Sequence, residues 1–308
     1  MQDERRVGSL FPHFRRILAG GEPSPHFFRK KVIRLSIAYF EGEFRPLTSV
    51  SIPVTDMALQ RGVGVFDSLR TLGGKPLALG LHLDRLESSL RDAGISEPAP
   101  REEIEAVIRE GIARMGEETS IRIYVTGGDR QEGGVFPAPR WFALFEPIHR
   151  LDPSTATQGV TLWPLPHERP LPLLKSINYM AAFVEKGLHP ESFEVLYCPA
   201  GEITEATSSN AFMVIDGKIV TAPLERVLSG VTRTFVLETA REAGYRVEER
   251  CPKVDELPKA AEFFITGSVK EIVPVVKVGS TRIGDGRPGP VTRHLTQILT
   301  ASLDRWVE

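Results

Sequence analysis

The chain has 308 residues, of which 41% are hydrophobic and 25% are charged, so it has enough apolar material for one sizeable core or two smaller ones. Its formal net charge of −2 mixes both signs, which argues against a nucleic-acid partner and favours small molecules. No run approaches the roughly 18 to 20 apolar residues that span a bilayer, and the opening sequence lacks a signal-peptide core. We therefore expect a soluble, cytoplasmic protein without a membrane segment.

The two cysteines, Cys198 and Cys251, have no CxxC spacing and no evident metal-ligand neighbours. This pattern argues against a disulfide framework and against a zinc site. It fits a reducing compartment, and we expect no bound metal.

The N-terminal segment, residues 1–35, is rich in Arg and Lys and keeps neither helical nor strand periodicity for long. We expect a poorly ordered extension here, or an over-long reading-frame start. A targeting peptide is the weaker alternative because Asp3, Glu4 and Glu22 interrupt the positive charge.

Regular structure is predicted to begin at residues 35–47, where two short strands turn at Glu41-Gly42. Residues 82–95 show the apolar spacing of an amphipathic helix that stops near Gly94, and residues 101–115 predict a second helix. Residues 121–126 then alternate like a strand. Together these elements predict a small α/β domain at residues 36–150.

A polar stretch with Pro and Gly, RLDPSTATQG, predicts an interdomain linker at residues 151–158. Beyond it, strands are predicted in VTLWPL, EVLYCP, AFMVIDGKIVTAP and EFFITGSV, and helices at residues 178–187 and 231–244. Residues 159–308 should form a larger domain. The expected fold class is α/β (α+β) in two domains.

The most specific segment is GEITEATSSNAFMVIDGKIVTAPLERVLSGVTR, residues 201–233. It ends by passing from a Gly-containing turn into an amphipathic helix. The amides and hydroxyl of Val231 and Thr232 should therefore lie at a helix N-terminus, where a phosphate is favoured. An ordinary helix cap would be the commoner explanation of these residues taken alone.

This segment resembles the class IV aminotransferase signature, because Glu205, Asn210, Phe212, Thr221 and Arg233 stand at permitted spacings. The resemblance covers about residues 37–305. It implies a fold type IV enzyme in which pyridoxal 5′-phosphate is bound between a small N-terminal and a larger C-terminal domain. It also implies a homodimer whose partner loops complete the pocket.

The segment LPLLKSINYMAAFVEK resembles the family's lysine segment, which implies that Lys175 holds the cofactor as a Schiff base and, once released, moves the substrate α-proton. Leu171, Leu173 and Leu174, on the expected strand end, would desolvate this amine and keep it neutral. The alternative is a surface lysine. Tyr179 matches a family tyrosine that hydrogen-bonds the cofactor phenolic oxygen, or else packs in a helix.

The resemblance implies three further cofactor ligands. Glu205 would face the pyridine nitrogen and favour the protonated ring, which is the better electron sink. Arg85 would give the phosphate paired, charge-assisted hydrogen bonds, although alone it reads as a solvent-facing helix arginine beside Asp84. Ser268, in FFITGSVKEIVPV, would also donate to the phosphate.

The substrate side is less specific, and we expect it to involve Phe66, Arg122, Gly267 and Val269. The D-amino-acid enzymes place an arginine after Val-Thr, where this chain has Gly127. That difference counts against this subtype.

Arg122 falls near an arginine of the branched-chain enzymes, but Ser120 replaces the aromatic residue expected two positions earlier. Many members of the family have an acidic residue where this chain has Val63, and a Glu where it has Asp67. These two differences leave the polarity of the pocket open.

We therefore expect a transaminase that moves the amino group of an aliphatic, branched-chain amino acid to 2-oxoglutarate. The alternatives are a D-amino-acid or R-amine transaminase, an aminodeoxychorismate lyase, and a catalytically silent binding relative. The silent relative is disfavoured because it would have no need of Lys175, Glu205 and Arg85 together.

Overall fold

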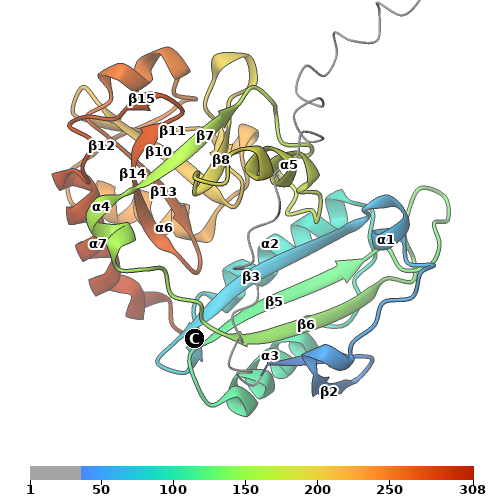
Figure 1. The fold of residues 1–308 in the computed structure, drawn as a ribbon. Coiled ribbons are helices and arrows are strands. Elements are labelled where there is room, and N and C mark those ends of the chain that lie inside the picture. Colours follow the sequence, from blue (N-terminus) through green and yellow to red (C-terminus); the bar gives the residue numbers. More distant parts are fainter. Residues whose placement is uncertain (1–35) are drawn as a thin grey trace, which may run out of the picture. The chain divides into compact units, whose positions relative to one another are not determined.

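The computed structural model describes residues 36–308 of the chain, so the predicted N-terminal extension lies outside the described residues. Two β-sheets, each covered by helices, make up residues 36–308 (Figure 1). None of the helices within this range is long and apolar enough to cross a membrane.

The first sheet has six strands in the order β2-β1-β6-β5-β3-β4. The predicted hairpin is confirmed, because Phe40 pairs with Glu43 and the two turn residues, Glu41 and Gly42, have φ of 51° and 83°. The strands are β1 (Ile37–Phe40), β2 (Glu43–Pro46), β3 (Gly64–Leu72), β4 (Lys75–Pro76), β5 (Thr119–Thr126) and β6 (Arg140–Pro147).

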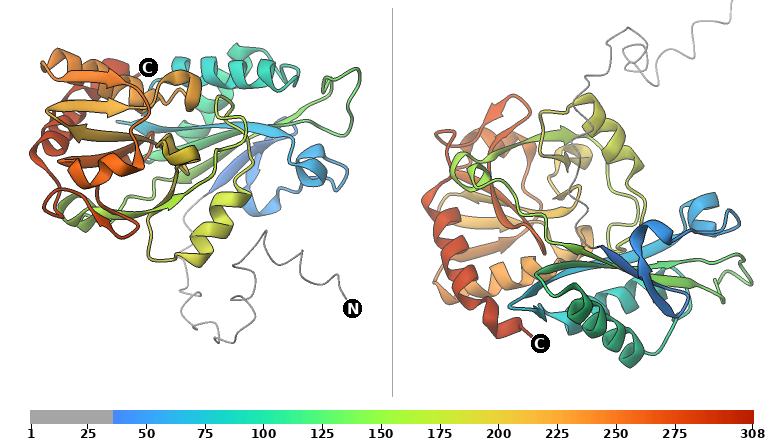
Figure 2. Two further views of the ribbon diagram at one scale, coloured as in Figure 1. Left: turned by 90° about the horizontal axis from the view of Figure 1, so that it is seen from above. Right: turned by 60° about the horizontal axis from the view of Figure 1, so that its bottom comes forward.

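Helices α2 (Leu79–Asp92) and α3 (Arg101–Met115) cover one face of this sheet (Figure 2). Both were predicted, although α2 begins three residues early because Leu79 is itself fully buried in the core. Alternate residues of β3 and β5 point toward these helices, so the opposite face keeps its own row of side chains. A short helix, α1 (Met57–Arg61), precedes β3.

The predicted linker contains a short helix, α4 (Ser154–Gln158), which ends at Gly159 with φ of 73°. The domain limits at residues 150 and 159 themselves stay a prediction.

The second sheet has nine strands, ordered β12-β11-β10-β13-β14-β7-β8-β9 with β15 beside β14. Helices α6 (Val231–Glu242) and α7 (Pro290–Ser302) cover one face, where the Phe212 and Phe264 rings stack with centroids 4.8 Å apart. The other elements are β7 (Val160–Leu165), α5 (Met180–Leu188), β8 (Glu194–Tyr197), β9 (Glu205–Ala206), β10 (Ser209–Ile215), β11 (Lys218–Thr221), β12 (Arg246–Glu249), β13 (Glu262–Gly267), β14 (Glu271–Val278) and β15 (Thr281–Arg282).

Candidate active site

A cleft brings Arg85, from helix α2 on the first sheet, together with residues of the second sheet, its loops and helix α6. It brings together every predicted cofactor ligand and Gly267, whereas Phe66, Arg122 and Val269 are not among its lining residues. The lining residues with predicted roles are Arg85, Lys175, Tyr179, Glu205, Val231, Thr232, Gly267 and Ser268.

Lys175 lies in a loop and not at the end of a strand, which corrects the sequence-based expectation. Pro170 and Pro172 lack backbone N–H groups, so this stretch cannot extend a sheet ladder. The loop is instead held against β3, because the Phe66 amide donates to the Lys175 carbonyl at 2.9 Å. Ser176 also forms a β-bridge with Val65.

The surroundings of the Lys175 amine also differ from those predicted. Leu171 and Leu173 are exposed, and only Leu174 is buried. The Lys175 Nζ lies 4.8 Å from the centroid of the Phe66 ring. Burial, helped by the positive charge of Arg85, lowers the pKa of Lys175 to about 7.

Tyr179 immediately precedes helix α5 and lines the same cleft. Its ring centroid lies 6.0 Å from that of Phe66. Burial raises the pKa of Tyr179 to about 12, so its hydroxyl stays protonated and can donate a hydrogen bond.

Glu205 forms a buried ion pair with Arg169, a residue that the sequence analysis missed. The Arg169 Nε lies 2.6 Å from Glu205 Oε1, and both side chains are 5% exposed. The Leu228 amide donates to the other carboxylate oxygen at 3.2 Å. Burial raises the pKa of Glu205 while Arg169 opposes that shift. A buried carboxylate requires a counter-charge, but nothing in the sequence indicates which cation supplies it.

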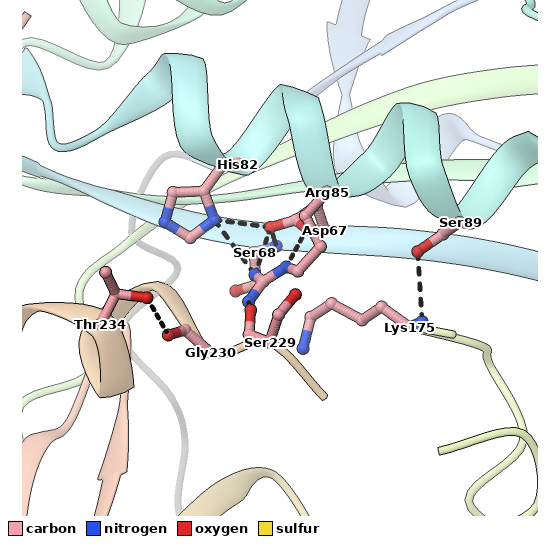
Figure 3. A network of polar contacts seen from close by, with 9 residues as sticks. All are labelled: Asp67, Ser68, His82, Arg85, Ser89, Lys175, Ser229, Gly230 and Thr234. Atoms are coloured by element: carbon pink, nitrogen blue, oxygen red, sulfur yellow. Dashed lines mark hydrogen bonds and ion pairs between the residues drawn. The ribbon is translucent and has the colours of Figure 1, made fainter. Parts of the chain in front are cut away.

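Arg85 is held by two buried side chains, as Figure 3 shows. Its Nε and Nη2 each donate to the Asp67 carboxylate at 2.8 Å, and its Nη1 donates to the Ser229 carbonyl at 3.0 Å. The ring of His82 contacts the same carboxylate through Nδ1 at 2.6 Å. Although burial opposes ionisation, Arg85 and His82 keep the pKa of Asp67 below its usual range. Arg85 is therefore not a solvent-facing helix arginine.

The start of helix α6 faces the cleft as predicted. Its cap is Gly230, and Val231 and Thr232 are its first two residues. The first amides of a helix have no acceptor within the helix, so they can bind an anion. A side chain at position 230 would collide with Asn210, since a Cβ there would lie 1.9 Å from its Oδ1. Only glycine leaves this approach open.

Comparison with known proteins supports the same interpretation. Residues 64–278 match the amino-transferase class IV family. The chain belongs to the class IV aminotransferases.

Two relatives of this aminotransferase differ in their named substrates. The chain is 30% identical to a putative branched-chain-amino-acid aminotransferase of Methanocaldococcus jannaschii, in a match that covers 87% of this chain and 96% of the relative. It is 28% identical to a D-alanine aminotransferase of Bacillus licheniformis, in a match that covers 86% of this chain and 96% of the relative. The predicted family and enzyme class are confirmed: the protein is a pyridoxal-phosphate-dependent transaminase.

Solved structures confirm the fold type. The branched-chain amino acid aminotransferase of Escherichia coli superposes with a TM-score of 0.79 at 25% identity, covering 88% of this chain and 96% of that one. A T.th. branched-chain amino acid aminotransferase, solved with pyridoxamine 5′-phosphate, superposes with a TM-score of 0.80 at 24% identity, covering 88% of this chain and 97% of that one. The predicted two-part α/β fold of the aminotransferases is therefore correct.

The cleft of this aminotransferase fits a phosphorylated pyridine cofactor. Arg85 bonds the Ser229 carbonyl just before helix α6, so a cation and the first helix amides lie together, and Glu205 adds a buried carboxylate to the lining. The buried Thr266 hydroxyl, also in the lining, has no hydrogen-bond partner among residues 36–308. Such an unused donor fits a cleft that accepts a polar ligand.

Next to the Lys175 amine, rings from three strands form a row. Phe66 stacks on Tyr124, which stacks on Phe142, with centroids 5.3 and 5.2 Å apart. Tyr124, two residues after Arg122, is the central ring of this row. Arg122 itself is ion-paired with Glu146.

Two departures noted in the sequence have structural explanations. Asp67 is fully buried behind Arg85 and does not line the cleft, so it does not set the polarity of the pocket. A Cβ at Gly127 would lie 2.9 Å from the Phe136 ring and 3.0 Å from the Val63 side chain. An arginine at this position would need both neighbours to move.

Proposed function

We propose that the protein transfers the amino group of an aliphatic, branched-chain amino acid to a 2-oxo acid such as 2-oxoglutarate. The observation that carries this proposal is the aromatic row of Phe66, Tyr124 and Phe142, which begins 4.8 Å from the Lys175 amine. An apolar substrate side chain gains free energy when such rings remove it from water.

The cofactor, when bound, supplies an electron sink for the carbanion at the substrate α-carbon. Four residues of the lining would hold its phosphate. They offer the cation of Arg85, the helix amides of Val231 and Thr232, and the hydroxyl of Ser268. Glu205 would hold a proton on the ring nitrogen, since Arg169 fixes the orientation of its carboxylate.

Lys175 would accept the α-proton through its amine. A base works best when its pKa is close to the working pH, and burial brings the pKa of Lys175 to about 7. The Phe66 ring beside the amine limits access of water to this transfer. Tyr179 would donate to the phenolic oxygen of the cofactor.

The donor is tested with cofactor-loaded protein and no acceptor. L-leucine, D-alanine and (R)-1-phenylethylamine are added separately, and the cofactor absorbance reports which donor reacts. A change with L-leucine alone supports the proposal. A change with D-alanine, the substrate named for one relative, assigns the protein to the D-amino-acid enzymes instead.

The Lys175→Ala variant is the matched control, since it should show no change with any donor. If the intact protein reacts with no donor but releases pyruvate from aminodeoxychorismate, the lyase becomes the better assignment.

Arg122 is our candidate for the acceptor's distal carboxylate. It lies across from Ser68 in the β3–β5 pair, one step along the same face from the Phe66–Tyr124 pair. An Arg122→Met variant should raise KM for 2-oxoglutarate and leave KM for 2-oxoisocaproate, which has no second carboxylate, unchanged. Equal effects on both acceptors would remove Arg122 from the substrate site.

We also propose that the enzyme is a homodimer. Apolar side chains around the Lys175 loop and helix α5 are exposed, among them Met180 at 73% and Phe183 at 68%. A cluster of this kind commonly marks a protein interface. Light scattering of the wild type should give twice the mass of one chain. The Phe183→Glu variant should give a lower mass, and a monomeric wild type would contradict the proposal.

The cytoplasmic location stays a prediction.

A further inference from the structure

The turn between β13 and β14 forms part of the wall of the cleft. Gly267 pairs with Glu271, so residues 268–270 make a three-residue hairpin loop. Gly267 and Ser268 line the cleft. The position of this loop therefore decides where the Ser268 donors point.

Glu271 closes the loop in a conformation that is unusual for its residue type. Its φ is +56°, in the left-handed region. Glycine is the usual residue in this conformation because it has no Cβ to clash. A glutamate here indicates that its side chain does something that offsets the backbone strain.

That side chain binds Arg70, which comes from β3 of the other sheet. The Arg70 Nη2 donates to Glu271 Oε1 at 2.6 Å, and its Nε donates to the Ser268 carbonyl at 3.1 Å. Arg70 is only 8% exposed. One buried guanidinium thus holds both the strained residue and the first residue of the loop.

The loop is anchored on its other side as well. The Lys270 amine is ion-paired with Glu194 and donates to the Ser208 and Ser209 hydroxyls at 2.9 Å each. Ser208 and Ser209 also line the cleft. The loop is therefore fixed to both of its neighbours and not free to move alone.

This anchoring orients the donors of Ser268. Because its carbonyl accepts from Arg70, the peptide unit that joins Ser268 to Val269 is fixed, and this fixes the backbone from which the Ser268 side chain projects. Neither the amide nor the hydroxyl of Ser268 donates to any acceptor in the part of the chain that the structure describes. Both donors are available for an anion in the cleft.

We propose that Arg70 and Glu271 are positioning residues, whose ion pair holds the 268–270 loop in the strained shape that presents Ser268 to the cofactor phosphate. The inference rests on the proposed phosphate contact of Ser268. Neither Arg70 nor Glu271 lines the cofactor cleft, so their effect must pass through the loop.

The test compares the affinities of the apoprotein for pyridoxal phosphate and for pyridoxal, which lacks the phosphate. The Arg70→Met variant should bind pyridoxal phosphate about tenfold more weakly, the effect of one lost hydrogen bond to a charged group. Its affinity for pyridoxal should not change.

A second variant gives the sharper result. In Arg70→Met/Glu271→Gly the loop can take the left-handed conformation without strain, so most of the lost affinity for pyridoxal phosphate should return. If Arg70→Met does not fold, Arg70→Lys serves instead, because lysine keeps the positive charge but lacks the planar fork through which Nε and Nη2 reach Ser268 and Glu271.

The matched control is Arg250→Met, which breaks another partly buried Arg–Glu pair, with Glu256 at 2.7 Å, outside the cleft. It should leave both affinities unchanged. If Arg70→Met lowers the melting temperature but keeps the preference for pyridoxal phosphate, or if the double variant recovers nothing, the inference is wrong. If the wild type itself shows no such preference, the proposed phosphate site fails first.

Discussion

The cofactor side, which lines the cleft, and the proposed substrate side, which lies beside it, are constructed differently. On the cofactor side, Glu205 and Arg85 each have a buried ionic partner, Arg169 in one case and Asp67 in the other. On the proposed substrate side, the Phe66–Tyr124 stack is half-buried, and the side chains of the Arg122–Glu146 pair are 38% and 32% exposed.

The difference has an energetic consequence. Removing one member of a buried ion pair leaves an uncompensated charge, which costs several kcal/mol, whereas a half-exposed pair contributes little. Changes on the cofactor side should therefore damage folding and chemistry together. Changes on the substrate side should alter preference and leave the rest intact.

The strongest test of the cofactor side is Lys175→Ala. Without its amine no group carries the α-proton, and turnover should fall by at least about a thousandfold. The measurement is the steady-state rate with L-leucine and 2-oxoglutarate. Lys277→Ala, at an exposed lysine on β14, is the control. A variant that keeps a tenth of the wild-type rate would exclude Lys175 as the base.

Glu205→Gln should have the next largest effect, because it removes charge and keeps shape. We expect kcat to fall about a hundredfold, as for the loss of one preorganised electrostatic contact. The free energy of unfolding should fall by about 3 kcal/mol, since Arg169 stays buried without its counter-charge. Chemical denaturation and kcat are measured on the same preparation, with Glu205→Asp as the charge-retaining control. A change in kcat alone would mean that Arg169 finds another partner.

The sequence indicated the cofactor side because its chemistry requires particular residue types at fixed spacing. The passage from Gly230 into a helix at Val231 is readable from a turn residue followed by an apolar periodicity. The resemblance to the family then placed Lys175, Glu205 and Arg85 in one site, and the structure brings them into one cleft.

The partners of these residues could not be predicted. Arg169 and Asp67 act through contacts between segments far apart in the chain, and no local pattern distinguishes them from surface charges. The three leucines before Lys175 suggest a buried strand end. The structure has a loop there, because two prolines in this stretch cannot donate the backbone hydrogen bonds of a sheet. Apolar residues mark a strand only where their N–H groups are free to pair.

The burial of Lys175 also predicts a pH dependence of stability for the apoprotein. Its pKa falls from an ordinary 10.5 to about 7, so between these values the unfolded chain binds more protons than the native protein. Relative to Lys175→Met, stability should rise as pH increases from about 7 to 10.5, by at most about 1.4 kcal/mol per pH unit.

Denaturant unfolding of both apoproteins across this range measures the difference. A difference that does not vary with pH would show that the amine is charged in the folded apoprotein.

The smallest effect is expected on the substrate side, from Tyr124→Leu. The substitution removes the central ring of the row between Phe66 and Phe142 but keeps an apolar surface. Losing the ring contacts should cost about 1 kcal/mol and raise KM for L-leucine about fivefold. The affinity for pyridoxal phosphate should stay the same, because Tyr124 does not line the cofactor cleft. A loss of cofactor affinity would show that the two sides are coupled, and the aromatic row would then support the Lys175 loop instead of selecting the substrate.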